Sequence, residues 1–99
     1  MISSDGIEKI AERISDLQDN MQIRIGGSDE DLAFTGNAAV GDTVTITALA
    51  DETYVGLIDR VRLIDTDVDI FAERIENIDK PANRLLLFTF QFRVVEEAA

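Results

Sequence analysis

The chain has no cysteine, no histidine and no tryptophan, and only one proline and one tyrosine among 99 residues. Without cysteine it can form no disulfide framework, thiolate nucleophile or cysteine-bound zinc site. Without histidine it lacks the commonest general base, metal ligand and pH switch, and its four serines have no partner for a hydrolase triad. These absences exclude most enzyme chemistries, so we expect a protein that binds or assembles and is not an enzyme.

Long apolar segments and an excess of positive charge are also missing. The longest apolar runs fall far short of the roughly 20 residues of a membrane span, and the first residues do not follow the signal-peptide pattern. We therefore expect no membrane insertion. The formal net charge of −11 repels phosphate backbones, so we expect no nucleic-acid binding either.

The choice of charged residues, and not only the net charge, indicates the salt concentration in which the protein works. Asp outnumbers Glu by twelve to eight, and Arg outnumbers Lys by seven to two. An Asp-rich, Lys-poor surface stays hydrated in concentrated salt, where a Debye length of about 3 Å at molar ionic strength removes most self-repulsion. We interpret the composition as adapted to high salt; an acidic protein from an ordinary environment is the alternative.

The chain length predicts a single domain over residues 1–99, and the hydrophobic fraction of 45% is typical of a folded chain. Its first element is an amphipathic helix over about residues 4–18. The apolar stripe of this helix has a period near 3.6, and Asp5 with Glu8 resembles a capping box. The stripe consists of Ile7, Ile10, Ile14 and Leu17.

A period of two follows, which indicates strands over about residues 21–95. We expect strands at 21–25, 32–35, 43–48, 57–64, 70–75 and 84–95, a polar link at 28–31 and a frayed acidic tail at 96–99. The segment 70–75 is expected to form a hairpin with 57–64. The fold class is mostly β, or α+β by count: an N-terminal amphipathic helix followed by a small antiparallel β-sandwich.

Asp65, Asp67 and Asp69 form the most suggestive cluster of ligand-type residues. Together with Glu76 they match the side-chain spacing of an EF-hand calcium loop. The sixth position of such a loop needs glycine, however, and Ile70 occupies it. We expect a solvated acidic turn, with a looser calcium site on the three aspartates as the alternative. No other cofactor is expected.

Two apolar features are candidates for a subunit interface. The helical stripe of Ile7, Ile10, Ile14 and Leu17 is more typical of a core than of an interface. Leu85 and Leu87 lie on the opposite face of the last strand from Leu86, which indicates a strand covered on both sides. Either the N-terminal helix or a neighbouring subunit can supply that second cover.

The order of these elements resembles small tail-fibre and tail-collar proteins of tailed viruses. The start Met1-Ile2-x-x-x-Gly6-Ile7 is similar to the "M-I-T-N-A-G" opening of that family. The most specific likeness runs from Phe71-Ala72-Glu73-Arg74 to Ile78-Asp79-Lys80, which is similar to "F-A-x-R … I-x-K", and the aromatic strand 85–92 follows it.

The resemblance implies a virion structural protein that self-associates and docks on a tail, baseplate or capsid surface. Its expected partners are further copies of the chain, with a trimer among the candidate symmetries, and other virion proteins. Combined with the composition, it implies a virus of a salt-loving archaeon. The alternative is a free-standing β-sandwich binding module, calcium-dependent in one version, that recognises a host glycan or protein.

Overall fold

The computed structural model describes residues 1–96, which form an elongated body of 48 × 23 × 22 Å. One helix, α1 (Ser4–Leu17), precedes seven strands. The strands are β1 (Gln18–Ile25), β2 (Ser28–Leu32), β3 (Phe34–Val40), β4 (Thr43–Ala50), β5 (Gly56–Asp65), β6 (Ile70–Lys80) and β7 (Leu86–Arg93).

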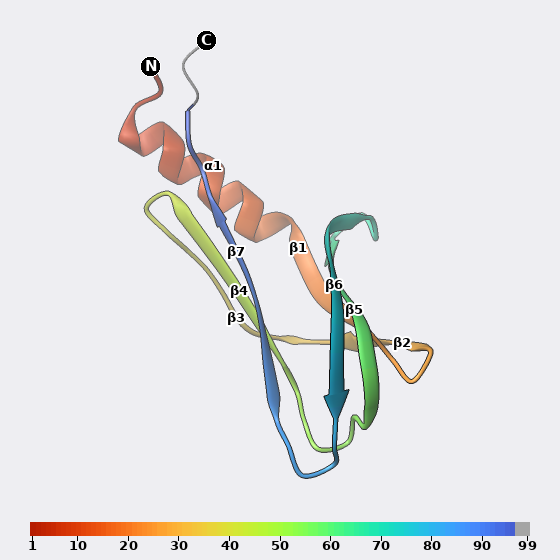
Figure 1. Ribbon diagram of the computed structural model, residues 1–99. Helices are drawn as coiled ribbons and strands as arrows, with labels where there is room; N and C mark the ends of the chain where they lie inside the picture. The colour runs from red at the N-terminus through yellow and green to blue at the C-terminus, as the bar shows by residue number, and fades with distance from the viewer. Residues whose placement is uncertain (97–99) are drawn as a thin grey trace.

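The strands form two antiparallel sheets that pack as a small sandwich (Figure 1). Sheet A has the order β2-β1-β5-β6, and sheet B has the order β3-β4-β7. The predicted fold class is therefore confirmed, as is the hairpin between β5 and β6.

The core lies between the sheets and consists of alternate strand residues together with Ala11 from α1. Its fully buried members include Met21, Ile23, Ile58, Val61 and Leu63 from sheet A and Val44, Ile46, Ala48 and Ala50 from sheet B. Phe88 and Phe90 complete it from β7. The β-branched alternation of residues 43–48 made this inward set predictable, because side chains point to opposite faces at successive positions.

Helix α1 lies along sheet B beside the ends of its strands (Figure 1). It begins after Ser3, whose hydroxyl accepts a hydrogen bond from the Gly6 N–H at 3.1 Å. The predicted capping box at Asp5 is thus wrong, because the helix starts before that residue. Serine is a strong N-cap, since its oxygen satisfies a backbone donor that the first helical turn leaves free.

The buried stripe of α1 differs from the predicted one. Ala11 and Ser15 are buried, whereas Ile10 and Leu17 are 40% and 45% exposed, so the core interpretation is wrong for those two residues. Ile14 is half-buried and packs against the core. The helix is rotated because its small residues face β3: Ser15 and Asn37 exchange hydrogen bonds across that contact.

Strand β2 was not predicted, because residues 28–31 have no apolar alternation. It forms a hairpin with β1 across Gly26 and Gly27, whose φ angles of 58° and 82° suit a two-residue turn. The predicted strand 32–35 is wrong, because Leu32 ends β2 and Phe34 begins β3, which continues to Val40. The remaining predicted strands are present with shifted ends, and β6 continues to Lys80. Residues 97–99 of the predicted tail lie outside the described residues, and the Glu96 carboxylate accepts hydrogen bonds from the Ile2 N–H.

Candidate functional site: an uncharged sheet face

The outer face of sheet B carries no acidic side chain. Because side chains alternate along a strand, the observed register defines which residues share this face. We call it the uncharged face, and it consists of Gly36, Ala38 and Val40 from β3, Thr43, Thr45, Thr47 and Leu49 from β4, and Leu87, Thr89 and Gln91 from β7. Arg93 pairs with Thr43 at the Val40 end of the same side and is the one charged strand residue that borders the face.

The centre of the uncharged face is a set of small polar side chains that bond to one another. Gln91 Nε2 lies 3.4 Å from Thr45 Oγ1, and the hydroxyls of Thr35 and Thr47 are 3.0 Å apart. Gly36 leaves room for Thr47, because a Cβ at that glycine would lie 2.8 Å from the threonine oxygen. Side chains that satisfy one another in this way lose few bonds to water when a partner covers them.

Apolar side chains lie at both ends of the uncharged face. Leu49 and Leu87 are opposite each other in the β4–β7 ladder and are 37% and 61% exposed. Leu85, just before β7, is 57% exposed, and Val40 at the other end is 76% exposed. These are large side chains that residues 1–96 cover only in part.

One ion pair closes the Val40 end of the face. Arg93 Nε donates to Asp42 Oδ2 at 2.9 Å, and Thr43 Oγ1 donates to Asp42 Oδ1 at 2.9 Å. The bond from Arg93, followed by that from Thr43, holds the pKa of Asp42 below its ordinary 3.8. Asp42, the acidic residue at this end of the face, is thereby paired.

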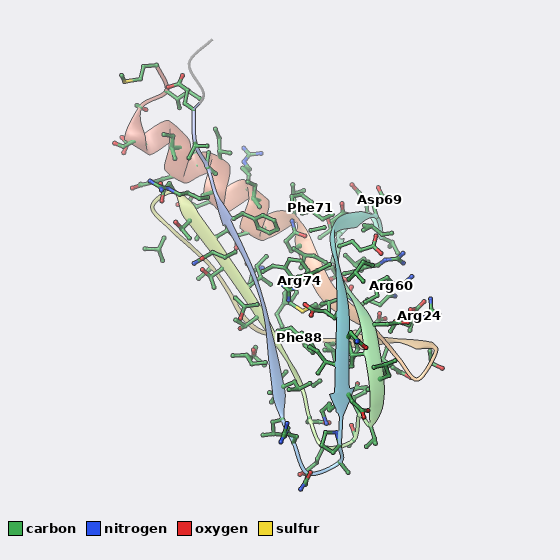
Figure 2. The ribbon with its side chains drawn as sticks, in the orientation of Figure 1. Arg24, Arg60, Asp69, Phe71, Arg74 and Phe88 are labelled. Atoms are coloured by element: carbon green, nitrogen blue, oxygen red, sulfur yellow. The ribbon has the colours of Figure 1, made fainter. Side chains whose placement is uncertain are left out.

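The outer face of sheet A has the opposite character. Arg60 contacts Asp29 at 2.6 Å and Glu73 at 4.0 Å, and Arg62 lies 3.4 Å from the same Glu73 oxygen. Arg24 adds a pair with Asp59 at 3.5 Å. Figure 2 shows Arg24 and Arg60 on the side of sheet A away from sheet B. Every acidic side chain within the strands belongs to sheet A, so charge separates the two faces of the sandwich.

The structure places the predicted interface residues in two regions. Leu87 belongs to the uncharged face, and Leu85 borders it. Ile10 and Leu17 lie on the exposed side of α1, whereas Ile7 and Ile14 are half-buried. Helix α1 does not cover Leu85 and Leu87, which removes the helix as the second cover of β7. The alternation in residues 43–49 and 87–91 predicts which side chains of each segment point outward. It does not predict that the two segments are neighbouring strands of one sheet.

The three aspartates of the acidic turn do come together. One carboxylate oxygen from each of Asp65, Asp67 and Asp69 lies within 4.8 Å of the others. Asp65 Oδ1 already accepts backbone N–H bonds from Asp67 at 2.9 Å and Asp69 at 3.0 Å. This carboxylate therefore has a structural role as the acceptor that closes the turn.

Glu76 does not join the acidic turn. It lies on β6, where its carboxylate accepts a 2.6 Å bond from Arg74 Nε. Strands flank the turn on both sides, so the structure excludes the helix–loop–helix geometry of an EF-hand. Val68 in the turn has a φ of 64°, a left-handed conformation that a β-branched residue rarely adopts.

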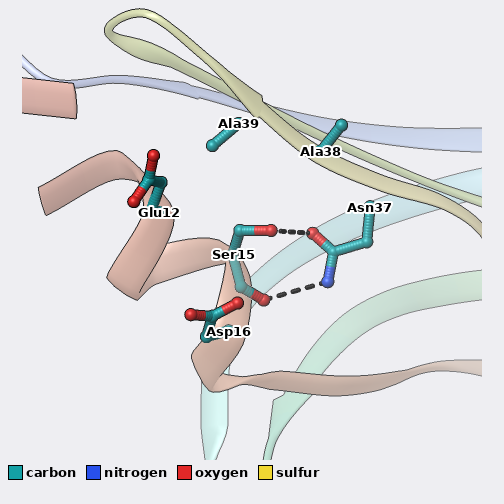
Figure 3. Close-up of a pocket in the computed structure, with 6 residues that line it drawn as sticks. All are labelled: Glu12, Ser15, Asp16, Asn37, Ala38 and Ala39. Carbon is teal, nitrogen blue, oxygen red and sulfur yellow. Dashed lines mark hydrogen bonds between the residues drawn. The ribbon is translucent and has the colours of Figure 1, made fainter. Parts of the chain in front are cut away.

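A shallow hollow of about 250 Å³ lies between α1 and β3 (Figure 3). Ser15 Oγ donates to Asn37 Oδ1 at 2.5 Å, and Asn37 Nδ2 donates to the Ser15 carbonyl at 2.9 Å. The remaining lining residues are Glu12, Asp16, Ala38 and Ala39. Because the two central polar groups satisfy each other, they hold the helix against the sheet and offer little to a ligand.

Comparison with protein-family models, curated proteins and solved structures found no match for this chain. The resemblance to tail-fibre and tail-collar proteins therefore stays a prediction. Among the described residues, no helix is long and apolar enough to cross a membrane.

Proposed function

We propose that the protein is a structural subunit of a tailed-virus particle, which self-associates and docks on a tail, baseplate or capsid surface. The observation that carries the assembly role is the uncharged face: a chain with a net charge of −11 has one sheet face with no acidic side chain. The viral assignment rests on the order of sequence elements.

Charge explains why this face suits a contact between copies. Two acidic molecules repel each other least where neither presents a carboxylate, and molar salt screens the charges that remain. Leu49, Leu85 and Leu87 supply apolar area, and fully covering one leucine contributes about 1.5–3 kcal/mol, so a partly exposed one contributes less. The charged outer face of sheet A is then the surface that stays in contact with solvent.

A charge placed at the centre of the face tests this role. We expect Thr45→Glu to abolish self-association in concentrated salt, measured by sedimentation velocity and light scattering, while the melting temperature changes little. Asn77→Glu adds the same charge at an exposed position on β6 and serves as the matched control. Equal self-association in both variants, or a wild-type chain that is strictly monomeric and does not co-purify with virions, would contradict the proposal.

A free-standing binding module is the second candidate, and the convergence of Asp65, Asp67 and Asp69 is the feature that favours its calcium-dependent version. A calcium titration followed by thermal melting separates the two. Assembly through the uncharged face requires no calcium, and a magnesium titration controls for general screening. A rise in melting temperature specific to calcium, lost in Asp67→Asn, would favour the binding module.

A further inference from the structure

Each sheet of a sandwich ends in strands whose outer backbone groups are free, and this chain protects three of its four edges. β2 carries the exposed acidic residues 29–31. β6 carries Glu73, Glu76 and Asp79, with two register shifts against β5. β3 has a register shift after Phe34 and is contacted by α1. Charges, bulges and covering elements are the usual protection against pairing with another chain.

Strand β7 has no bulge and no acidic residue, and side chains of β6 cover only part of its edge. It pairs with β4 over eight consecutive residues without a register shift, and its only charged residue, Arg93, is the last. It contains no proline. Figure 1 shows β7 and β6 running side by side with no strand between them. A regular, uncharged and largely apolar edge of this length is a template for strand addition.

The hydrogen bonds show which backbone groups of β7 are free. Arg74 Nη1 donates to the Thr89 carbonyl at 2.9 Å from the β6 side, so that carbonyl points away from β4. At the end of the strand, Val94 N–H donates to the Asp42 carbonyl on the β4 side. In an antiparallel ladder these directions alternate, so the N–H and C=O groups of Leu87, Thr89 and Gln91 face outward.

Arg74 covers only part of this edge. Figure 2 shows it between β6 and β7, with its guanidinium carbon 4.8 Å from the centre of the Phe90 ring. Its Nε also bonds Glu76, so the side chain keeps a charged partner when it leaves the Thr89 carbonyl. Within residues 1–96 it is the one side chain that bonds an outward-facing backbone group of β7.

We propose that β7 pairs antiparallel with β7 of a second copy of this chain, joining the two B sheets into one six-stranded sheet. The inference rests on the self-association in the proposed function, but it places the contact between two copies at the β7 edge, where the preceding test places it at the uncharged face. It favours a second β7 as the occupant because the β2 and β6 edges carry acidic side chains, whereas β7 and its neighbour β4 carry none. Like strands related by a two-fold axis also form a closed dimer.

This pairing makes the two uncharged faces continuous. The six-stranded sheet has the order β3-β4-β7-β7-β4-β3, and its outer surface presents both copies of the face with no acidic residue between them. Arg74 must leave the Thr89 carbonyl of each copy for the new ladder to form. The dimer then offers other virion proteins twice the uncharged surface of one chain.

A proline at Thr89 tests the edge directly. The N–H that it removes faces away from β4, so the ladder within sheet B loses no bond, and proline is tolerated at such edge positions. We expect Thr89→Pro to weaken dimerisation in molar salt by about tenfold or more, since each copy loses a donor and gains a blocking ring. Circular dichroism and thermal melting show whether the variant is folded.

Cross-linking gives a second measurement that does not depend on the proline variant. The wild-type chain has no cysteine, so a single introduced cysteine can form a disulfide only with another copy. Gln91→Cys and Thr89→Cys place a thiol on β7, and Thr45→Cys places one on β4 directly opposite Gln91. Edge pairing predicts covalent dimers for one or both β7 variants and none for the β4 variant.

The outcomes separate this inference from the proposed function. Dimers that persist in Thr45→Glu but are lost in Thr89→Pro would support edge pairing and contradict assembly through the face. Dimers that are lost in Thr45→Glu, persist in folded Thr89→Pro and cross-link at residue 45 would overturn edge pairing and support stacking of the faces. A chain that stays monomeric in molar salt would overturn both.

Discussion

Val68 is the residue whose replacement tests the structure most sharply. It is 82% exposed, so its side chain buries little surface, yet its φ of 64° lies in the left-handed region. A side chain with a Cβ costs about 1–2 kcal/mol in that conformation. Glycine removes this cost but loses about 0.5–1 kcal/mol more chain entropy on folding. We expect Val68→Gly to stabilise the fold by about 0.5–1 kcal/mol, which raises the melting temperature by about 2–8 °C.

Urea unfolding with linear extrapolation measures this change in the free energy of unfolding. The turn keeps its backbone hydrogen bond from the Val68 N–H to the Asp65 carbonyl at 3.0 Å, because glycine retains the donor. Val55→Gly is the matched control, since Val55 is an exposed loop valine without a positive φ. We expect the control to lose about 0.5–1 kcal/mol. If Val68→Gly loses as much stability as Val55→Gly, the strain assigned to residue 68 is refuted.

Three further predictions concern buried charge, pH and salt. Lys80 is 1% exposed and its ammonium donates to the Tyr54 carbonyl at 2.6 Å, so Lys80→Met should lower the free energy of unfolding by about 1–3 kcal/mol in urea titrations. The pKa of Asp42 lies below 3.8, mainly because Arg93 bonds its carboxylate, so its contribution to stability is present above pH 3.8 and is lost as the pH falls through the folded pKa. A carbon NMR titration of the Asp42 carboxyl should therefore give a lower midpoint in the wild-type chain than in the Arg93→Gln variant. Finally, the melting temperature should rise from low to molar potassium chloride, since salt screens the repulsion of a net charge of −11; a flat or falling curve would contradict the salt-adapted interpretation.

The strands that could be predicted are those whose own side chains build the core. Residues 43–48 and 86–94 alternate apolar and polar side chains. The structure buries Val44, Ile46 and Ala48 of the first set, and it buries Phe88 and Phe90 of the second while Leu86, Phe92 and Val94 are half-buried. Strand β2 could not be predicted from its own sequence, Ser-Asp-Glu-Asp-Leu, because only Leu32 is buried. It forms a strand because the Gly26-Gly27 turn brings it beside β1. Local pattern predicts elements that bury apolar area, and it misses those that are held by their neighbours.

The same distinction holds for the helix and for the uncharged face. The contact side of α1 is set by Ala11 and Ser15, small residues that let it approach β3, and hydropathy alone favoured Ile10 and Leu17. The outward threonines of β4 and the outward Thr89 and Gln91 of β7 were predictable strand by strand. That β4 and β7 are neighbours is a property of topology, since thirty-five residues separate them in the chain.

The self-association of the wild-type chain is the most direct test of the central claim that the uncharged face and its β7 edge exist for assembly. Sedimentation equilibrium in molar potassium chloride, over a wide range of protein concentration, gives the mass of the species directly. We expect a concentration-dependent dimer or larger oligomer that weakens at low salt, where copies with a net charge of −11 repel each other. A single species of 10.9 kDa at every concentration and salt would contradict it.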